Sequence, residues 1–153
     1  MRHHVSKILP YTPDQLFALV GDVNAYPDFV PWITSMRTWN ARRLGEGVEA
    51  VDAEAGVGFS FLKERFSTRV RRDLTNSRID VSLLSGPFKH LANHWEFHPD
   101  ATGTRVEFDI DFQFKSRLLE ALLAANFGRA VDRLMECFEG RAEALYGTAE
   151  PAD

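Results

Sequence analysis

The chain has 153 residues and a mass of 17.4 kDa, a size that fits one domain with a buried core. It is 44% hydrophobic with twelve phenylalanines, which excludes a disordered chain, and no apolar run reaches the roughly 18 residues that a membrane-spanning helix needs. The formal net charge of −4 argues against a generally basic nucleic-acid-binding protein, and we expect no DNA partner.

The first predicted elements are a strand and a short helix. Alternating residues from Val5 to Leu9 predict a strand that stops at Pro10. A helix should follow from Pro13, because Thr12 can cap its first turn and proline suits the first helical position. The N-terminal residues have neither the apolar stretch of a signal peptide nor the composition of a transit peptide, so we expect a cytoplasmic protein, most simply a bacterial one.

Residues 24–33, NAYPDFVPWI, combine two prolines with three aromatic rings. Pro27 and Pro31 exclude the interior of a regular helix, because each removes a backbone donor and clashes with the preceding turn. We therefore predict a bent segment whose rings either close the end of the core or line the mouth of a pocket. The sequence leaves these two alternatives open.

Strand patterns fill the middle of the chain. The predicted strands cover residues 35–42, 47–55, 57–73, 78–85, about 91–97 and 105–114. Apolar and polar residues alternate in the last of these, which is typical of an antiparallel sheet with one solvated side. In the strand before it, Asn93 shares one side with Leu91 and Trp95. An apolar element must cover the dry side of this sheet.

Residues 116–146 have the pattern of one long helix, about thirty residues and roughly 45 Å in length. Its apolar stripe consists of Leu119, Leu122, Leu123, Phe127, Ala130, Val131, Leu134, Phe138, Ala142 and Leu145. Gly128 in its middle costs about 1 kcal/mol relative to alanine, which close packing on a strand would explain. We predict an α+β fold, a curved antiparallel β-sheet wrapped around a long C-terminal α-helix, with residues 1–147 as one domain and 148–153 as a flexible tail.

Candidate catalytic and metal-binding groups are few. His90, His94 and His98 are four residues apart, but on a strand this spacing is about 13 Å, too far for two of them to share a metal. We expect a solvated face there and no metal site. Cys137 is the only cysteine, which excludes an intrachain disulfide, and its helical spacing predicts a small core residue. For Asp22, beside the aromatic segment, a helix cap is favoured over a catalytic acid, and we predict no catalytic residue.

The middle of the chain is also rich in basic residues. From Arg37 to Arg78 there are nine basic and six acidic residues. The favoured interpretation is that these residues form the solvated outer faces of strands, and the alternative is a surface that faces phospholipid or RNA.

Three stretches carry a resemblance to a known family. DVNAYPDFVPW near the start, LLSGPFKHLANHWEFHP in the middle and CFEGRAEALYG near the end resemble the coenzyme Q-binding branch of the START superfamily, within the polyketide-cyclase-like helix-grip proteins. The resemblance spans about residues 3–147, with Ile33 at a position where many members are expected to carry cysteine. It implies the helix-grip fold and a non-catalytic protein that holds ubiquinone or a similar polyprenyl lipid in a hydrophobic tunnel and supports respiratory electron transport.

The same resemblance implies two alternative functions, because one fold can carry several. Close bacterial relatives are described as toxins that bind the ribosome and block association of its subunits, and the wider family implies a cyclase or dehydratase. In the favoured function ubiquinone is a bound ligand, and no redox cofactor is expected.

The predicted tunnel lies between the sheet and the C-terminal helix, with an aromatic mouth formed by residues 24–33 and the turn at Gly86. The predicted ligand-binding residues are Tyr26, Phe29, Pro31, Trp32, Leu83, Pro87, Phe88, Leu91, Trp95, Phe108, Phe112, Leu122, Phe127, Val131, Leu134 and Phe138. Rings with a polar edge suit a membrane–water interface, so we expect transient contact with a membrane surface, at the periphery of the inner membrane.

Overall fold

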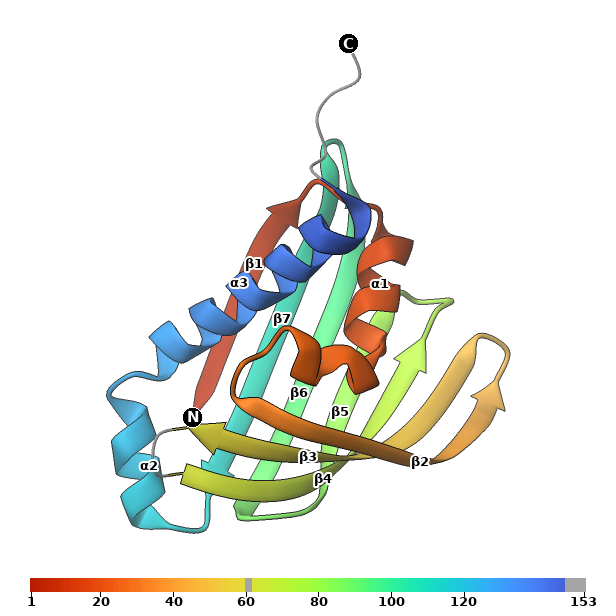
Figure 1. The fold of residues 1–153 in the computed structure, drawn as a ribbon. Helices are drawn as coiled ribbons and strands as arrows, with labels where there is room; N and C mark the ends of the chain where they lie inside the picture. The colour runs from red at the N-terminus through yellow and green to blue at the C-terminus, as the bar shows by residue number, and fades with distance from the viewer. Residues whose placement is uncertain (60–61, 148–153) are drawn as a thin grey trace.

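The computed structural model describes residues 1–59 and 62–147, apart from the side chains of Phe59 and Leu62. The tail expected at residues 148–153 therefore lies outside the described residues. Within them, the chain forms one antiparallel sheet, with helices on its concave side (Figure 1). The predicted α+β class, a curved antiparallel sheet with a C-terminal helix against it, is confirmed.

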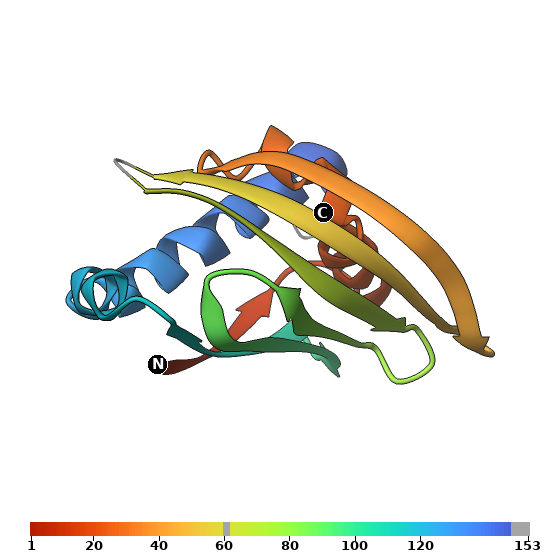
Figure 2. The same cartoon turned by 90° about the horizontal axis from the view of Figure 1, so that it is seen from below.

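The sheet has seven strands in the order β1-β7-β6-β5-β4-β3-β2. Their bounds are β1 (Arg2–Leu9), β2 (Ile33–Gly45), β3 (Val48–Phe59), β4 (Leu62–Asp73), β5 (Arg78–Ser85), β6 (Phe88–Asp100) and β7 (Gly103–Phe114). All neighbouring strands are antiparallel. The sheet curls strongly, so that the C-terminal helix lies between the half made by β2–β4 and the half made by β6, β7 and β1 (Figure 2).

Two helical segments follow β1. Helix α1 (Pro13–Gly21) begins with a capping box, in which the Gln15 N–H donates to Thr12 Oγ1 at 3.1 Å and the Thr12 N–H donates to Gln15 Oε1 at 3.0 Å. The predicted start at Pro13 is confirmed. The predicted bent segment forms a short 3₁₀ helix, η1 (Val23–Asp28), which tolerates Pro27 because it is not a regular α-helix.

The predicted single C-terminal helix is wrong, since the structure has two helices, α2 (Arg117–Ala124) and α3 (Phe127–Tyr146). Asn126 leaves the helical region, with φ −128° and ψ 14°, and its N–H donates to the Leu123 carbonyl at 2.9 Å. Helix α2 packs against β7, whereas α3 packs against β1 and α1. The two helices therefore pack against different elements, and a weak helix former, Asn126, occupies the break between them.

The predicted strand at residues 57–73 is also wrong, because β3 ends at Phe59 and β4 begins at Leu62, with these two residues paired across the hairpin. Sequence patterns give no turn signal there. Gly56 and Gly58 lie inside β3, where β2 approaches closely: a Cβ on Gly56 would lie 2.4 Å from Ser35 Oγ. Glycine at these positions permits close strand contact and does not mark a turn.

The helices of the described residues include none that is long and apolar enough to cross a membrane.

Candidate ligand-binding site

The concave face of the sheet is apolar and carries two groups of packed side chains. The large cluster lies under α1 and α3 and consists of Leu9, Leu16, Leu19, Val20, Val23, Val51, Ala53, Val70, Ile79, Trp95, Phe97, Val106, Phe108, Val131, Met135, Phe138 and Ala142. The small cluster consists of Phe88, Leu91, Phe112 and Phe114, with Leu119 and Leu123 of α2 packed against it. These two clusters account for most of the core between the sheet and the C-terminal helices.

A row of inward-facing side chains crosses the sheet between the two clusters. It consists of His3, Ile110, Asn93 and Val81, which are direct neighbours in β1, β7, β6 and β5. We call these four residues the middle row. All four keep partial exposure to solvent, although each points toward the helices.

The partial exposure of the middle row is informative because its neighbours are buried. On β6, Asn93 stands between Leu91 and Trp95, which are 8% and 4% exposed. On β7, Ile110 stands between Phe108 and Phe112, which are 1% and 4% exposed. A helix that covered the sheet evenly would bury the middle row as well. The middle row is thus less completely buried than the residues on either side of it.

The aromatic residues of η1 pack into the large cluster. The ring centroids of Tyr26 and Phe29 each lie 5.3 Å from that of Phe138 on α3, in edge-to-face contacts. The Tyr26 hydroxyl donates to the Val20 carbonyl, and burial, together with the nearby Asp22, raises its pKa. The segment was expected either to close the end of the core or to line the mouth of a pocket. In the structure these two rings pack against α3 and close the core there.

The other side chains of the predicted mouth lie elsewhere. Phe88 stacks on Phe114 at 4.9 Å and belongs to the small cluster, so it does not join Tyr26 and Phe29. The turn before it is fixed by the Lys115 N–H, which donates to the Pro87 carbonyl at 2.9 Å. The Trp32 carbonyl accepts the Gly58 N–H at 2.9 Å, at the start of β2, and Pro31 is exposed. The predicted mouth residues are therefore divided between separate places.

Most residues predicted to line the tunnel do face the concave side. Trp95, Phe108, Val131 and Phe138 are core residues of the large cluster, and Leu91 and Phe112 belong to the small one. Leu134 packs against the large cluster, Leu83 against the small one, and Phe127 against both. These nine positions combine the inner face of the sheet with one face of α3.

Leu122 is the exception among the predicted lining residues, with 46% of its surface exposed. Leu119 and Leu123 take the inner side of α2, because the break at Asn126 turns this helix relative to α3. Met135 was not predicted and is 3% exposed in the large cluster. Its spacing, four residues after Val131, is the signal that could have identified it.

The lone thiol is not a core residue. Cys137 is only partly buried and lies outside both clusters, so the predicted core position is wrong. Cys137 directly precedes Phe138 in α3 and lies beside the buried stripe of this helix. Burial still raises the pKa of the thiol, which leaves it in the less reactive protonated form.

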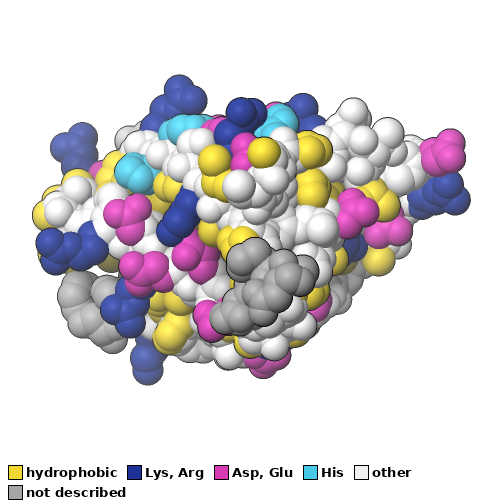
Figure 3. All heavy atoms as spheres, turned by 90° about the horizontal axis from the view of Figure 1, so that it is seen from above, with side chains coloured by type: hydrophobic (Ala, Val, Ile, Leu, Met, Phe, Trp, Pro, Cys, Tyr) yellow, Lys and Arg dark blue, Asp and Glu magenta, His cyan; other side chains and the backbone are white. Residues whose placement is uncertain are grey.

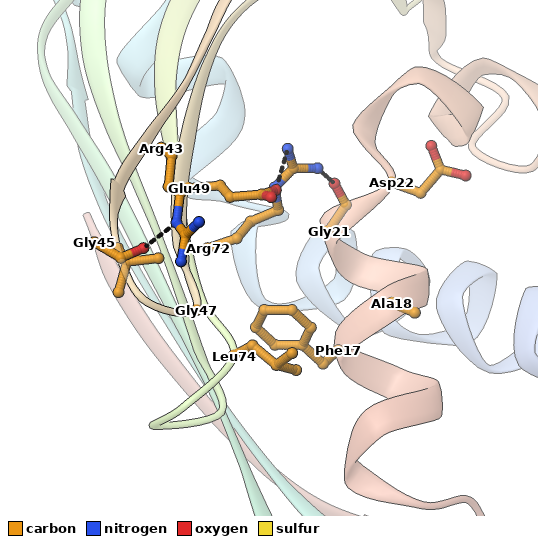
Figure 4. Close-up of a pocket in the computed structure, with 11 residues that line it drawn as sticks. Phe17, Ala18, Gly21, Asp22, Arg43, Gly45, Gly47, Glu49, Arg72 and Leu74 are labelled. Atoms are coloured by element: carbon orange, nitrogen blue, oxygen red, sulfur yellow. Dashed lines mark hydrogen bonds and ion pairs between the residues drawn. The ribbon is translucent and has the colours of Figure 1, made fainter.

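A pocket of about 510 Å³ opens between α1 and the ends of β2, β3 and β4 (Figure 4). Phe17 and Leu74 form its apolar wall, and the Arg72 guanidinium lies opposite. Arg72 Nη1 donates to the Gly21 carbonyl at 2.9 Å, and Nη2 lies 3.7 Å from Glu49 Oε2. The Arg72 guanidinium thus interacts with groups of the protein itself, the Gly21 carbonyl and the Glu49 carboxylate.

Asp22 at the edge of this pocket is exposed and points away from Arg72 (Figure 4). It stands between α1 and η1, but its side chain makes no capping hydrogen bond, so the predicted capping role is fulfilled by its backbone alone. An exposed carboxylate without a positioned partner is a poor candidate for a general acid.

The histidines of β6 lie on the convex face, opposite Trp95, as predicted. His90 Nε2 lies 3.2 Å from Asp111 Oδ1, and His98 Nε2 lies 3.4 Å from Glu96 Oε1. His94 contacts both Asp80 and Glu96. In the space-filling view, histidines gather along one edge among acidic and basic side chains (Figure 3). Among the described residues no three metal-binding side chains are arranged so that they could hold a metal ion.

Most of the basic residues between Arg37 and Arg78 also lie on the convex face, where pairs of arginines share single carboxylates. Arg69 Nε donates to Asp52 Oδ1 at 3.1 Å, and Arg42 Nη1 lies 3.6 Å from the same oxygen. Hydrogen bonds, first from Asn40 and then from Arg69, lower the pKa of Asp52. Glu54 is shared in the same way by Arg37 and Arg65. This part of the convex face therefore keeps a net positive charge.

Comparisons with known proteins extend these observations. A family model described as "Polyketide cyclase / dehydrase and lipid transport" matches residues 9–139. The ribosome association toxin RatA of Rickettsia prowazekii is 36% identical over 141 residues, which cover 90% of this chain and 93% of that protein. The mitochondrial coenzyme Q-binding protein COQ10 homolog B of Xenopus laevis is 29% identical over 149 residues, 95% of this chain and 59% of that protein.

A solved structure is more similar in sequence. The solution structure of the 18 kDa protein CC1736 from Caulobacter crescentus has 65% sequence identity and a TM-score of 0.81. The match covers 97% of this chain and 99% of that one. The whole described fold thus has an experimentally determined counterpart.

Proposed function

Because the chain belongs to the polyketide cyclase / dehydrase and lipid transport family, in the branch that contains both RatA toxins and COQ10 homologues, we propose that it binds a polyprenyl lipid such as ubiquinone on its concave face, without catalysing a reaction. The helix-grip fold supplies the framework, a curled sheet closed by α3. The resemblance to the coenzyme Q-binding branch, predicted from the sequence, is confirmed by these relatives.

The observation that carries the proposal is a partly exposed middle row between two apolar clusters on the concave face. A prenyl chain is a hydrocarbon, and each five-carbon unit gains about 4 kcal/mol on leaving water, at about 0.8 kcal/mol per carbon. The aromatic and aliphatic side chains of the two clusters offer such a chain the surface it needs. Concave apolar surface with a few polar groups is the usual form of a ligand site.

The polar groups of the interior support binding better than catalysis. Tyr26 is engaged with the Val20 carbonyl, and Asp22 points outward at the edge of a separate pocket. His3 and Asn93 are the polar members of the middle row, and the nearest ring to His3 is that of Phe127, with centroids 5.8 Å apart. A cyclase or dehydratase requires an acid or base held by a second polar group, and the buried Oδ1 of Asn93 has no hydrogen-bond partner within the described chain.

The test is direct titration of lipid-free protein with a short-chain prenyl quinone. Of the three tryptophans, Trp95 faces the interior, so a Trp32→Phe, Trp39→Phe background makes its emission a specific probe of ligand binding. We expect saturable quenching at one ligand per chain. Val131 is too buried for a charge to be introduced without unfolding, and Leu134 is the better site.

Two variants with the same chemical change separate binding from general effects. Leu134→Glu places a charge on the inner face of α3 and should abolish the quenching, because a buried carboxylate next to the prenyl chain is strongly unfavourable. Leu118→Glu makes the same change at a position that is 67% exposed and should leave binding intact. Equal binding by both folded variants would refute the interior site.

Ribosome association is the second candidate function, and it is supported by the RatA relatives and by the positive convex face. Arg65, Arg69 and Arg71 belong to this face, whereas Arg72 faces the pocket and is left unchanged in the test. If phosphate contacts dominate, cosedimentation with large ribosomal subunits should weaken steeply with salt.

Charge reversal on two surfaces distinguishes specific from general electrostatic attraction. The double variant Arg65→Glu, Arg69→Glu should no longer sediment with the subunits. The control is Arg129→Glu, Arg133→Glu, which makes the same change at exposed positions of α3 and should still sediment. Leu134→Glu should still sediment. Failure of the unmodified protein to sediment at low salt would eliminate this function.

A further inference from the structure

The middle row contains an acceptor whose hydrogen-bonding capacity is unused. Asn93 Oδ1 is buried and has no hydrogen-bond partner within the described part of the chain. Its strand neighbours are a leucine and a tryptophan on the same face, and its cross-strand neighbours in the middle row are Val81 and Ile110. An asparagine at this place breaks the apolar pattern of the concave face at one point.

An unpaired acceptor in the interior destabilises a protein, because the group loses its water and gains nothing in exchange. A leucine of similar shape would avoid this loss. A single water molecule is a poor partner here, since buried waters need two to four polar groups and the cross-strand neighbours of Asn93 are apolar. The group that satisfies Oδ1 is therefore expected to come with a larger, mostly apolar molecule.

The position of Asn93 fits a ligand with a single polar end. It lies in the partly exposed middle row, between the aromatic residues of the small cluster and those of the large cluster. A hydrocarbon chain can pack on either cluster while a polar head reaches the middle row. Because Oδ1 is an acceptor, the head must supply a donor.

We propose that Asn93 Oδ1 accepts a hydrogen bond from a hydroxyl group of the bound lipid, an inference that rests on the proposed function. The interior site then takes a hydroxyl-bearing prenyl lipid, and among quinone lipids it prefers the hydroquinone to the quinone, whose ring oxygens are acceptors only. Hydroquinones and prenyl alcohols share this chemistry, and the experiment separates these two sources.

The experiment compares matched pairs of ligands that differ only in the donor. Lipid-free protein with Trp95 as the single tryptophan is titrated, under reducing conditions, with a farnesyl hydroquinone and its dimethyl ether, and with farnesol and its methyl ether. We expect at least one hydroxyl compound to bind about tenfold more tightly than its ether, the ratio expected for one hydrogen bond to a group that is otherwise unpaired. The pair that shows the preference identifies the source of the hydroxyl.

Two variants assign the preference to Asn93. Asn93→Leu should bind each compound and its ether with equal affinity, and it should raise the melting temperature of the lipid-free protein, because the unpaired acceptor is gone. A merely structural asparagine would lower the melting temperature when replaced. Ser82→Ala, next to Val81 but on the convex face, removes a hydroxyl from the opposite side of the sheet and should keep the preference.

Three results would overturn the inference while leaving the proposed function intact. The first is equal binding of both hydroxyl compounds and their ethers by the unmodified protein. The other two are a preference retained in Asn93→Leu and a melting temperature lowered by that change. If none of the four probes binds, the proposed function fails and the inference fails with it.

Discussion

Two glycines differ in whether the fold requires them. At one position only glycine fits the backbone, and at the other a side chain could be accommodated. Gly103 at the start of β7 has φ +149°, and a Cβ there would lie 2.1 Å from the Leu9 carbonyl oxygen. Gly140 lies inside α3, and a Cβ there would meet nothing within 4 Å. The first glycine is needed for the approach of β7 to the chain after β1, whereas the second is not.

Alanine at these two positions should act in opposite directions. Gly103→Ala should destabilise the protein by at least about 2 kcal/mol, from backbone strain and the clash with Leu9. Gly140→Ala should stabilise it by about 0.5–1 kcal/mol, the helix-propensity difference at an exposed position. Urea unfolding measures both, and a Gly103→Ala variant as stable as the parent would contradict the described turn.

The shared carboxylate on β3 makes stability depend on pH. The pKa of Asp52 is lowered in the fold by Asn40 and Arg69, so the folded state binds a proton there more weakly than the unfolded state. Its contribution is therefore complete above the ordinary value of 3.8 and is lost as the pH falls through and below it. Asp52→Asn should cost about 1–3 kcal/mol at pH 7, and this difference should shrink between about pH 5 and pH 2. A difference that stays constant over this range would contradict the assignment.

For single residues, sequence patterns predicted correctly which side chains face the concave side of the sheet. They did not predict which hydrogen bonds those side chains make. Alternation along β6 and β7 placed Leu91, Asn93, Trp95 and Phe108 on the concave face, where they are found. Nothing in the alternation indicates that the Asn93 acceptor lacks a partner, because that depends on residues from other strands. Leu122 was misplaced because its orientation depends on the helix break.

At the scale of elements, the two C-terminal helices differ in how firmly they are held. Helix α3 has four buried residues, Val131, Met135, Phe138 and Ala142, whereas α2 has none. Helix α2 is anchored by Leu119 and Leu123 and by Glu120, whose Oε2 accepts the Phe114 N–H at 2.8 Å. It is a short segment that covers one end of the concave face.

Hydrogen exchange should reflect this difference. Local opening of α2 exposes little apolar surface, so its amides should exchange on the order of ten times faster, or more, than those of the central turns of α3. Exchange followed by NMR resolves the two helices residue by residue. Equal protection of α2 and the centre of α3 would mean that the two helices open as one unit.

Element boundaries were predictable where local chemistry sets them and not where packing does. The start of α1 follows from Thr12 and Pro13, which act within one turn. The break between α2 and α3 follows from contacts with different elements, β7 for α2 and β1 and α1 for α3, and the glycines of β3 reflect the close approach of β2. Such contacts are long-range in sequence, and periodicity alone does not contain them.

At the scale of the whole molecule, the two faces of the sheet have different chemistry. The concave face holds the aromatic and aliphatic clusters and the middle row, and the convex face holds the arginine–carboxylate groups of β2–β4 and the histidines of β6. Lipid binding and ribosome association would use opposite faces of the sheet. Each can therefore be removed by substitutions that leave the other intact.

The central claim is that the concave face holds a polyprenyl lipid, and the most direct measurement is mass spectrometry of a solvent extract of the protein purified from quinone-producing cells. We expect about one polyprenyl quinone or hydroquinone per chain, retained by Leu118→Glu and absent from Leu134→Glu. An extract without prenyl lipid, or with equal amounts from both variants, would contradict the claim and leave the convex face as the functional surface.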